Sequence, residues 1–189
     1  YSGGVKPGDR VVVFGLGGIG LNVVQGARIA GADVIVGVDL NEGKRALAES
    51  LGMTHFVNPA VCSDLNARLV ELTRGGADVA FECVGHTGVM RQALECCRVG
   101  WGVCVVIGVE HSKDEMSFPP KLVRYGRIVK GSYFGGIKGR TQLPQLVDWY
   151  IEGKIKVDDL ITHVLPIERI NEGFDLMRAG RSIRSVVTF

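Results

Sequence analysis

The sequence has little of what marks a membrane protein, a secreted protein or a nucleic-acid-binding protein. Its apolar runs, such as residues 103–109, are strand-length and fall well short of the roughly 20 residues that span a bilayer. Nothing at the amino terminus is typical of a signal peptide. The 22 basic and 20 acidic residues are interspersed and give a formal net charge of +2. We therefore expect neither nucleic acid nor a membrane as partner.

Cysteine and histidine are too few and too scattered to suggest disulfides or a metal site. The five cysteines are an odd number, and they are Cys62, Cys83, Cys96, Cys97 and Cys104. None forms a Cys-x-x-Cys pair, and adjacent Cys96 and Cys97 would point about 100° apart on a helix. The four histidines show no metal-binding spacing. We expect reduced, buried thiols in a cytoplasmic protein, and no metal ligand in this chain.

The alternation of two apolar periods predicts the fold. With 46% apolar residues in 189, the chain is long and apolar enough to form a core. Short β-branched runs alternate with segments in which apolar residues recur every three or four positions. The predicted strands are residues 11–16, 34–39, 56–58, 78–83, 103–109 and 128–134. Strands that are apolar on both sides, separated by helices, indicate an α/β fold with a doubly wound parallel Rossmann sheet of six strands.

A glycine-rich turn follows the first predicted strand. Residues 15–20 read Gly-Leu-Gly-Gly-Ile-Gly, and helical spacing begins at residue 21. In such a GxGxxG turn the first glycine permits the tight bend, the second lets the backbone approach a pyrophosphate, and the third lets the helix pack closely. The amino terminus of the helix faces the phosphates. This context predicts a dinucleotide site that contains Gly15, Leu16, Gly17, Gly18, Ile19 and Gly20.

Asp39 ends the second predicted strand, where a ribose-binding carboxylate is expected. A carboxylate there accepts both ribose hydroxyls and repels a 2′-phosphate, so we predict NAD as the cofactor in preference to NADP. The alternative is that the glycines only form a turn and that Asp39 caps a helix starting at Asn41. Lys44 is a further candidate at the adenosine ribose, although an exposed lysine is more often simply solvated.

Other polar residues suit structural roles. Tyr150 and Lys154 have the Tyr-x-x-x-Lys spacing of short-chain dehydrogenases, but the glycine pattern differs and the expected serine is missing, so we assign Tyr150 to helix packing. Asp78 and Glu82 share one face of a strand, where carboxylates without a partner base usually form structural hydrogen bonds. We therefore predict no catalytic residue in this chain.

The pattern changes after residue 134. The elements predicted there are helices over residues 141–153 and 167–179 and a strand over residues 185–189. Pro144 would lie in the first turn of the first helix, and Gly180 would end the second. These elements are too small to bury a core alone. We assign residues 1–134 to the NAD-binding domain and residues 135–189 to the carboxy-terminal part of a second domain.

Eight segments together resemble the medium-chain zinc alcohol dehydrogenases. They are GLGGIG at 15–20, VDLN at 38–41, FECVG at 81–85, GWG at 100–102, VIGV at 106–109, FGGIKGRTQLP at 134–144, ITHVLP at 161–166 and SIRSVVTF at 182–189. FGGIKGRTQLP and GWG are most similar to the class III, glutathione-dependent formaldehyde dehydrogenases. The likeness runs in order from Val5 to Phe189.

The resemblance implies an NAD site that extends along most of the chain. Besides the glycine turn and Asp39, it implicates Lys44, Val84, Ile107, Gly108, Val109, Ser132, Tyr133, Phe134 and Arg184. Val84 and residues 107–109 would flank the adenine-side and nicotinamide ribose regions, and residues 132–134 would lie near the nicotinamide. Arg184 would pair with the pyrophosphate, which suits a bidentate guanidinium.

The resemblance also implies chemistry that depends on zinc. In the family, zinc polarises the alcohol oxygen and hydride moves to the nicotinamide ring. The zinc ligands of the family precede the start of this chain, so we expect zinc in the full-length enzyme and no turnover by this chain alone. Residues 135–189 would then belong to the catalytic domain.

The resemblance points to S-hydroxymethylglutathione or a primary alcohol as substrate. Val99 stands where many class III members carry a lysine associated with the glutathione carboxylate, and Arg98 is the neighbouring cation. A dehydrogenase for ordinary primary or aromatic alcohols is one alternative, and a non-catalytic NAD-binding module is another. The family also implies a homodimer that pairs through the sixth-strand edge, for which residues 116–118 and 128–134 are candidates.

Overall fold

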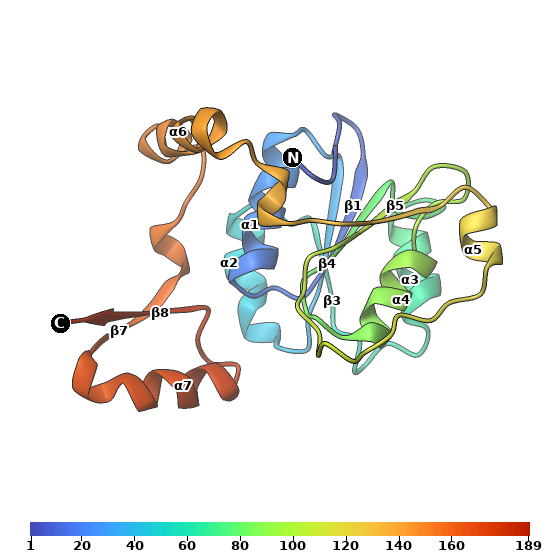
Figure 1. Cartoon of the computed structure of the whole chain (residues 1–189). Coiled ribbons are helices and arrows are strands. Elements are labelled where there is room, and N and C mark those ends of the chain that lie inside the picture. Colours follow the sequence, from blue (N-terminus) through green and yellow to red (C-terminus); the bar gives the residue numbers. More distant parts are fainter. The chain divides into compact units, whose positions relative to one another are not determined.

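The computed structural model describes all residues from Tyr1 to Phe189 and contains two compact units (Figure 1). The first unit is Tyr1–Lys138 and the second is Gly139–Phe189. None of the helices combines the length and the apolar character needed to cross a membrane. The division falls within the FGGIKGRTQLP segment, a few residues after the domain boundary that we predict from the sequence.

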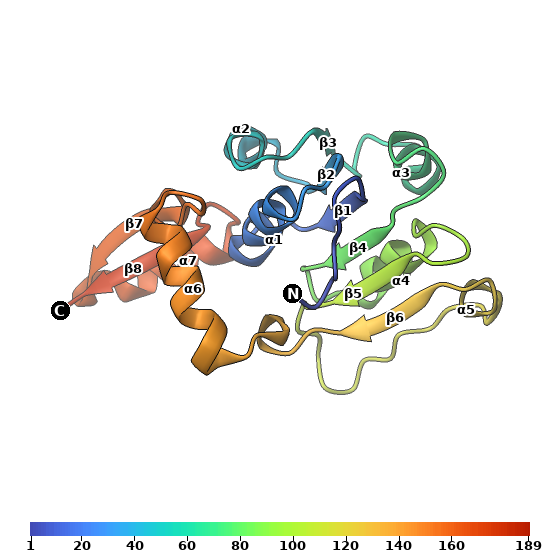
Figure 2. The same cartoon turned by 90° about the horizontal axis from the view of Figure 1, so that it is seen from above.

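The first unit is built on a parallel sheet in the order β3-β2-β1-β4-β5-β6 (Figure 2). The strands are β1 (Arg10–Phe14), β2 (Val34–Val38), β3 (His55–Val57), β4 (Val79–Glu82), β5 (Val103–Val106) and β6 (Ile128–Gly131). All five neighbouring pairs are parallel. The winding direction reverses between β1 and β4, which is where doubly wound folds bind ligands. The predicted six-stranded Rossmann sheet is confirmed.

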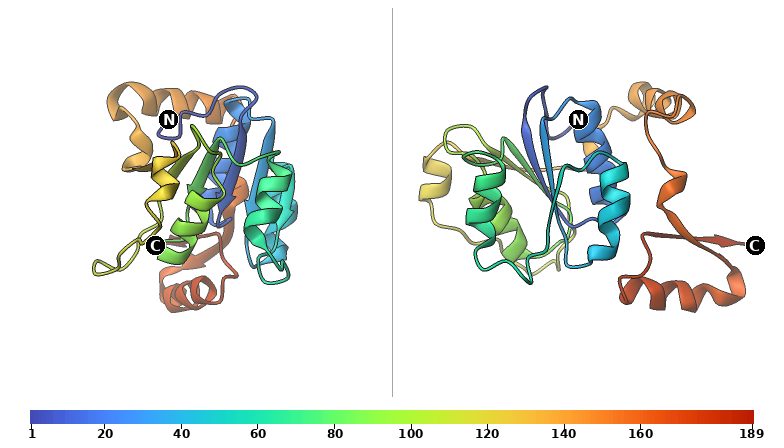
Figure 3. Two further views of the ribbon diagram at one scale, coloured as in Figure 1. Left: turned by 90° about the vertical axis from the view of Figure 1, so that its right-hand side faces the viewer. Right: turned by 180° about the vertical axis from the view of Figure 1, so that it is seen from behind.

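Helices cover both faces of this sheet. They are α1 (Gly18–Ile29), α2 (Arg45–Ser50), α3 (Leu65–Leu72), α4 (Thr87–Glu95) and the short α5 (Lys121–Arg124), with the 3-10 turns η1 (Glu42–Lys44) and η2 (Phe134–Gly136). α1 and α2 lie on one face, and α3 and α4 lie on the other (Figure 3). Val11, Val12 and Val13 of β1 are all fully buried. Since successive side chains point to opposite faces, β1 is apolar on both sides, as expected between two helical layers.

The strands end earlier than predicted, so the turns at the carboxyl edge are longer. β1 ends at Phe14 because Gly15 takes a φ of +86°. β5 ends at Val106: the Ile107 N–H makes the last bond of the ladder, to the carbonyl oxygen of Glu82, and the Gly108 N–H then donates to the same oxygen. α1 begins at Gly18, within the glycine motif. The residues of this unit that are predicted to bind a dinucleotide therefore lie at one edge of the sheet, on turns or at the start of α1.

β6 is the outer strand on its side of the sheet, since it pairs with β5 alone. Ile128 on this strand is 50% exposed. Met116 and Phe118 are partly buried and pack against the main core. Of the two segments proposed for an apolar edge, residues 128–131 form it and residues 116–118 belong to the core of the unit.

The second unit contains two helices and a two-stranded parallel ribbon. Its elements are α6 (Gly139–Ile151), η3 (Asp158–Leu160), β7 (Ile161–Pro166), η4 (Ile167–Arg169), α7 (Ile170–Arg178) and β8 (Arg184–Thr188). β7 pairs with β8 and is a strand that the sequence pattern does not predict. α6 begins before residue 141, so Pro144 lies in its second turn and the prediction for the first turn is wrong.

Tyr150 and Lys154 do not form a pair in this unit. The hydroxyl of Tyr150 donates to Asp158 Oδ2 at 2.7 Å. Lys154 lies beyond the end of α6, and its Nζ is 2.6 Å from Glu152 Oε2. Tyr150 is exposed, so the predicted helix packing does not describe it either. Its hydroxyl instead connects the end of α6 to η3.

Candidate cofactor-binding site

The glycine turn between β1 and α1 combines two tight positions with one open position. Gly15 donates its N–H to Val38 O at 2.8 Å. A Cβ on Gly20 would overlap the carbonyl oxygen of Gly15, so only glycine lets α1 start against the turn. A Cβ on Gly17 would meet nothing within 4 Å. The fold therefore requires glycine at residues 15 and 20, whereas at residue 17 it leaves open space in front of the backbone.

The amino end of α1 faces this open space without a cap. Gly17 is the N-cap residue, no side chain caps the helix, and its first turn carries no acidic residue. The first bond of this turn runs from Leu21 N–H to Gly17 O at 2.9 Å, so the amides of residues 17–20 have no acceptor within the helix. Free amides and the positive end of the helix dipole suit a pyrophosphate.

Asp39 connects the end of β2 to the glycine turn. Its Oδ2 accepts the Leu16 N–H at 2.7 Å and lies 2.9 Å from Lys44 Nζ, and its Oδ1 accepts the Asn41 N–H at 2.8 Å. A carboxylate offers about four acceptor positions, so three are in use and one is left. The side chains of Asp39 and Lys44 are 9% and 19% exposed. Ribose hydroxyls would therefore share this carboxylate with donors of the chain.

Asp39 is not the cap of the turn that follows it. The cap of η1 is Asn41, whose side chain accepts the Gly43 N–H at 2.9 Å. This separates the roles of the two residues, because Asn41 caps η1 while Asp39 holds the glycine turn and Lys44. The alternative that Asp39 serves as a helix cap is therefore not supported by the geometry.

Two exposed apolar side chains flank the glycine turn. Val84 follows β4 and is 53% exposed, and Leu40 follows β2 and is 69% exposed. Because β1 lies between β2 and β4, the two residues stand on either side of the turn. A Cβ on Gly15 would lie only 2.8 Å from Val84 Cγ2. Sequence reasoning missed Leu40, and its signal is a large apolar residue directly after the strand-ending carboxylate.

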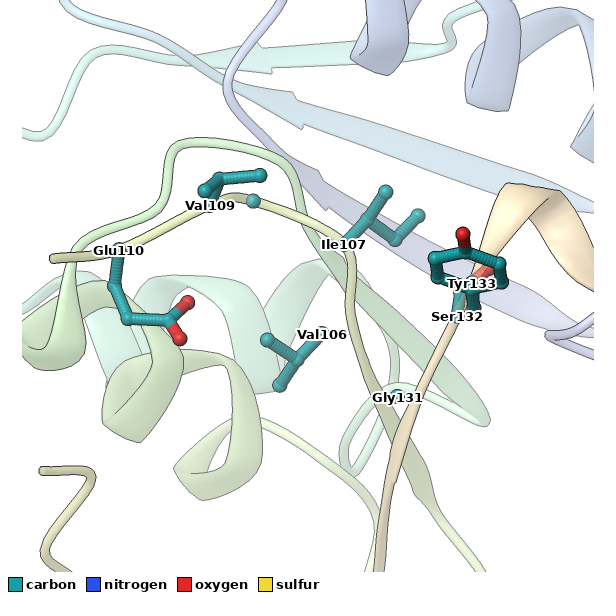
Figure 4. A pocket seen from close by; sticks show the side chains of 8 residues that line it. Val106, Ile107, Val109, Glu110, Gly131, Ser132 and Tyr133 are labelled. Carbon is teal, nitrogen blue, oxygen red and sulfur yellow. The ribbon is translucent and has the colours of Figure 1, made fainter. Parts of the chain in front are cut away.

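A cavity of about 520 Å³ lies at the carboxyl ends of β5 and β6 (Figure 4). Its lining is Val106, Ile107, Gly108, Val109, Glu110, Gly131, Ser132 and Tyr133. Five of the predicted site residues, in two segments far apart in the sequence, therefore lie around one cavity. Tyr133 is 95% exposed, and Phe134, which is also exposed, follows it with a φ of +49°.

Ser132 fixes the segment that leaves β6. Its N–H donates to Val106 O at 2.9 Å, and its hydroxyl donates to Ser2 Oγ at 2.8 Å. Ser2 also donates its N–H to Gly135 O at 3.2 Å. The amino-terminal segment thus holds one wall of the cavity in place.

Arg184 lies in the second unit, at the first position of β8, and is exposed. The turn before it is held by Thr162. Thr162 Oγ1 accepts the Ile183 N–H at 3.1 Å and donates to Arg184 O at 3.2 Å. Contact between Arg184 and a dinucleotide stays a prediction.

Arg98 is held by the fold rather than free for a ligand. Its guanidinium donates to Thr73 O at 3.1 Å and to Arg74 O at 3.0 Å, and its Nε lies 3.5 Å from Asp78 Oδ1. Asp78 precedes β4, so this cluster lies at the amino edge of the sheet, opposite the cavity. Arg98, the cation next to Val99, is therefore not free to replace the missing lysine.

The cysteines and histidines form no metal site. No group of three or more His, Cys, Asp or Glu side chains is placed to hold a metal ion, and all five cysteines are free. Burial, with a smaller effect of the nearby Glu82 charge, raises the pKa of Cys83 to about 12. Burial also raises the pKa of Cys104. These two cysteines are therefore neutral thiols at neutral pH.

Known proteins of one family match this chain. The profile of the zinc-binding dehydrogenases matches residues 18–152. The class-3 alcohol dehydrogenase of Cereibacter sphaeroides is 56% identical over 192 residues, covering 98% of this chain and 51% of that protein. The S-(hydroxymethyl)glutathione dehydrogenase of Paracoccus denitrificans is 54% identical over 191 residues, again covering 98% and 51%. The chain therefore spans about half the length of the curated relatives it matches.

Solved structures show the same fold. An alcohol dehydrogenase zinc-binding domain protein from Burkholderia ambifaria has a TM-score of 0.93 and 30% identity, covering 100% of this chain and 50% of that chain. A zinc-binding dehydrogenase from Sinorhizobium meliloti, solved with NADP bound, has a TM-score of 0.85 and 26% identity, covering 100% and 54%.

Proposed function

This chain belongs to the zinc-binding dehydrogenase family, and from that premise we propose that it is the NAD-binding part of a zinc-dependent alcohol dehydrogenase of class III type. One observation carries the proposal. The amino end of α1 is uncapped and faces open space at Gly17, at the edge where the winding of the sheet reverses. The residues present fit a dinucleotide there, because amides, a carboxylate and apolar side chains meet its phosphates, ribose and rings respectively.

Each end of the dinucleotide has its own residues in this proposal. The amides of residues 17–20, which have no acceptor within the helix, bind the pyrophosphate, and Arg184 adds a guanidinium to it. Asp39 and Lys44 hold the adenosine ribose, while Leu40 and Val84 provide apolar contacts for the adenine. Ile107, Gly108 and Val109, together with Ser132, Tyr133 and Phe134, surround the nicotinamide end. The cavity between these last two segments supports that assignment.

In this proposal the chain binds the cofactor, and none of its side chains acts as a catalytic group on the alcohol. When bound, NAD supplies a ring that accepts hydride, and zinc in the whole enzyme polarises the alcohol oxygen. We therefore expect the pure chain to bind NAD and to produce no NADH when an alcohol is added.

The negative charge of Asp39 supports NAD in preference to NADP. A 2′-phosphate on the adenosine ribose would lie against a carboxylate that already holds three donors. Lys44 offsets part of that repulsion, since its Nζ lies 2.9 Å from the carboxylate. A related protein from Sinorhizobium meliloti was solved with NADP bound, so the affinities of this chain for NAD and for NADP are both to be measured.

For the substrate, the relatives' names support S-hydroxymethylglutathione or a primary alcohol. Val99 in place of a lysine, with Arg98 engaged elsewhere, favours a second candidate, an ordinary primary or aromatic alcohol. Turnover of the whole enzyme with formaldehyde, with and without glutathione, separates the two. A strict need for glutathione supports the first, and equal rates support the second.

We also propose a homodimer that forms along β6, and a cytoplasmic location. Ile128 on β6 and Tyr125 just before it are exposed. The Tyr125 carbonyl oxygen accepts the Gly100 N–H at 2.8 Å, which holds the segment before β6 against the turn before β5. An unpaired edge strand of this kind tends to find a partner. Five free cysteines support a reducing compartment.

Two alanine substitutions, one at the N-cap of α1 and one inside the helix, test the cofactor site. Neither Gly17→Ala nor Gly26→Ala would bring a Cβ within 4 Å of another group, and neither residue has a positive φ. Both variants should therefore fold. Gly17→Ala places a methyl group where the pyrophosphate must approach, so the Kd for NAD should rise roughly tenfold or more. Gly26→Ala lies within the same helix and should leave the Kd unchanged.

Isothermal titration of the 189-residue chain measures both constants, and thermal unfolding checks the fold of each variant. We expect Gly26→Ala to raise the Tm slightly, because alanine favours a helix interior by about 1 kcal/mol over glycine. Failure of the unaltered chain to bind NAD would overturn the proposal, as would equal affinities of the two variants.

A further inference from the structure

Glu82 is a fully buried carboxylate at the carboxyl end of β4. Its Oε1 accepts the N–H groups of Val84 and Gly85, each at 2.8 Å. Its main-chain oxygen accepts the N–H groups of Ile107 and Gly108 at 2.9 and 3.0 Å. One residue thus binds the turn after β4 with its side chain and the turn after β5 with its backbone.

The two turns meet closely because two glycines lack side chains. A Cβ on Gly85, whose φ is +83°, would overlap the carbonyl oxygen of Val109. A Cβ on Gly108 would overlap the Gly85 nitrogen and would lie 2.7 Å from Glu82 Oε2. The turns therefore have a single fitting arrangement, and the Glu82 carboxyl group fills the space that the Gly108 side chain would occupy.

This arrangement has a cost that a purely structural residue would avoid. Glu82 Oε2 is buried and has no hydrogen-bond partner. A buried polar atom without a partner opposes folding, and an apolar side chain of similar size would remove that cost. An apolar side chain could not accept hydrogen bonds from two amides, so it could not fix the direction of the turn that carries Val84.

We propose that Glu82 is a positioning residue. By accepting the Val84 and Gly85 amides it holds the Val84 side chain where that side chain contacts the adenine half of the dinucleotide. The inference rests on the proposed NAD site. Glu82 itself lies beneath the turn and does not touch the ligand. The hydrogen bonds of its side chain go to the β4 turn alone, because the bonds to Ile107 and Gly108 come from its backbone and survive substitution. The adenine half should therefore sense a change at Glu82 more than the nicotinamide half does.

Three variants of the full chain separate positioning from stability. Glu82→Met fills the space but accepts no hydrogen bond. Glu82→Gln keeps an oxygen that accepts both amides and serves as the conservative rescue. Val79→Ala, at the other end of β4, removes buried apolar volume and is the control for lost stability. Should Glu82→Met not fold, Glu82→Asp replaces it, because its shorter side chain keeps the charge but draws the oxygens away from the two amides.

Titrations with NAD and with AMP, made well below the Tm of each variant, test the proposal. We expect Glu82→Met to raise the Kd for both ligands by a similar factor, roughly tenfold, since AMP contains only the adenine half. Glu82→Gln should stay close to the unaltered chain. Val79→Ala should lower the Tm without changing either Kd.

Unchanged affinities in Glu82→Met would overturn the inference, and so would an equal loss of affinity in Val79→Ala. A loss for NAD without a loss for AMP would contradict the assignment to the adenine half. If the unaltered chain binds neither ligand, the proposed function fails instead, and this outcome is distinct from the others.

Discussion

Lys44 Nζ and the N–H of Leu16 meet the same oxygen of Asp39, at 2.9 and 2.7 Å. The carboxylate therefore serves the fold and the proposed ribose site together. Replacing Asp39 by Asn keeps the shape and an acceptor but removes the charge. A 2′-phosphate that carries two negative charges and lies about 5 Å from a carboxylate is repelled by about 1.7 kcal/mol in water, so the ratio of the NADP and NAD affinities should shift roughly 10- to 20-fold toward NADP.

Titration of each variant with both nucleotides measures this shift. Asp33→Asn is the matched control, because Asp33 precedes β2 and lies at the opposite edge of the sheet. It removes the same charge and should leave the ratio unchanged. If Asp39→Asn discriminates against NADP as strongly as the unaltered chain does, the charge of Asp39 does not set the preference.

Thr162 should matter for binding only through Arg184. Thr162→Val keeps the shape of the side chain and removes the hydroxyl that bonds to Ile183 and Arg184, whereas Thr162→Ser keeps the hydroxyl. A hydrogen bond contributes about 1 kcal/mol, so Thr162→Val should weaken NAD binding by about fivefold and Thr162→Ser by less. AMP lacks the pyrophosphate and should bind all variants equally.

A double-mutant cycle completes this test. Because Thr162 is expected to act through Arg184, adding Thr162→Val to Arg184→Ala should cost nothing further. Additive losses in the double variant would show that Thr162 affects binding by another route. An Arg184→Ala variant with normal NAD affinity would remove Arg184 from the proposed site.

If the chain dimerises along β6, its mass in solution should be twice that of one chain. Sedimentation equilibrium at micromolar concentration should give twice the 20.3 kDa of one chain. Ile128→Lys places a charge on this edge and should give the mass of one chain, because charged edge strands resist pairing. Val61→Lys is the control, since Val61 is exposed and follows β3 at the other side of the sheet. A monomeric mass for the unaltered chain would contradict the dimer.

Cys83 should react slowly although it lies beside the proposed site. Its pKa of about 12 means that the reactive thiolate is scarce at pH 8, about a ten-thousandth of the total. The thiolate fraction rises tenfold with each pH unit until the pKa is reached, so the alkylation rate should rise with pH in the same proportion. Peptide mapping after iodoacetamide treatment measures this rate. Labelling of Cys83 at the same rate in native buffer and in concentrated urea would contradict the burial that raises its pKa.

The sequence predicts the first unit well because its signals are local. Consecutive valines make both faces of a strand apolar, which indicates a buried parallel strand. The glycines at residues 15 and 20 mark a turn whose geometry requires glycine at both positions. The strand β7 is missed because its pattern does not alternate cleanly, and its pairing with β8 depends on residues far along the chain. Element ends are also misplaced where a residue distant in sequence holds the turn after a strand, as Glu82 O holds the Gly108 N–H after Val106.

Only part of the candidate site can be predicted from the sequence. Asp39 and the glycines follow a local motif, whereas Leu40 is recognised only once its exposure and its place beside the turn are known. Glu82 looks like an ordinary structural carboxylate until its two acceptor roles join separate turns. Arg98 looks free until its guanidinium is found between the carbonyls of residues 73 and 74. In each case the missing information is a contact between residues distant in sequence.

The position of β1 between β2 and β4 has a kinetic consequence. Val11 pairs with Ile35 on β2, a close neighbour in sequence, and with Val79 on β4, which is much further along the chain. Distant pairings close larger loops and form more slowly, so the β1–β4 junction should be completed late in folding. A ligand that binds at that junction can stabilise only the completed sheet. NAD should therefore slow unfolding while leaving the refolding rate unchanged, and stopped-flow measurements in both directions would detect this asymmetry.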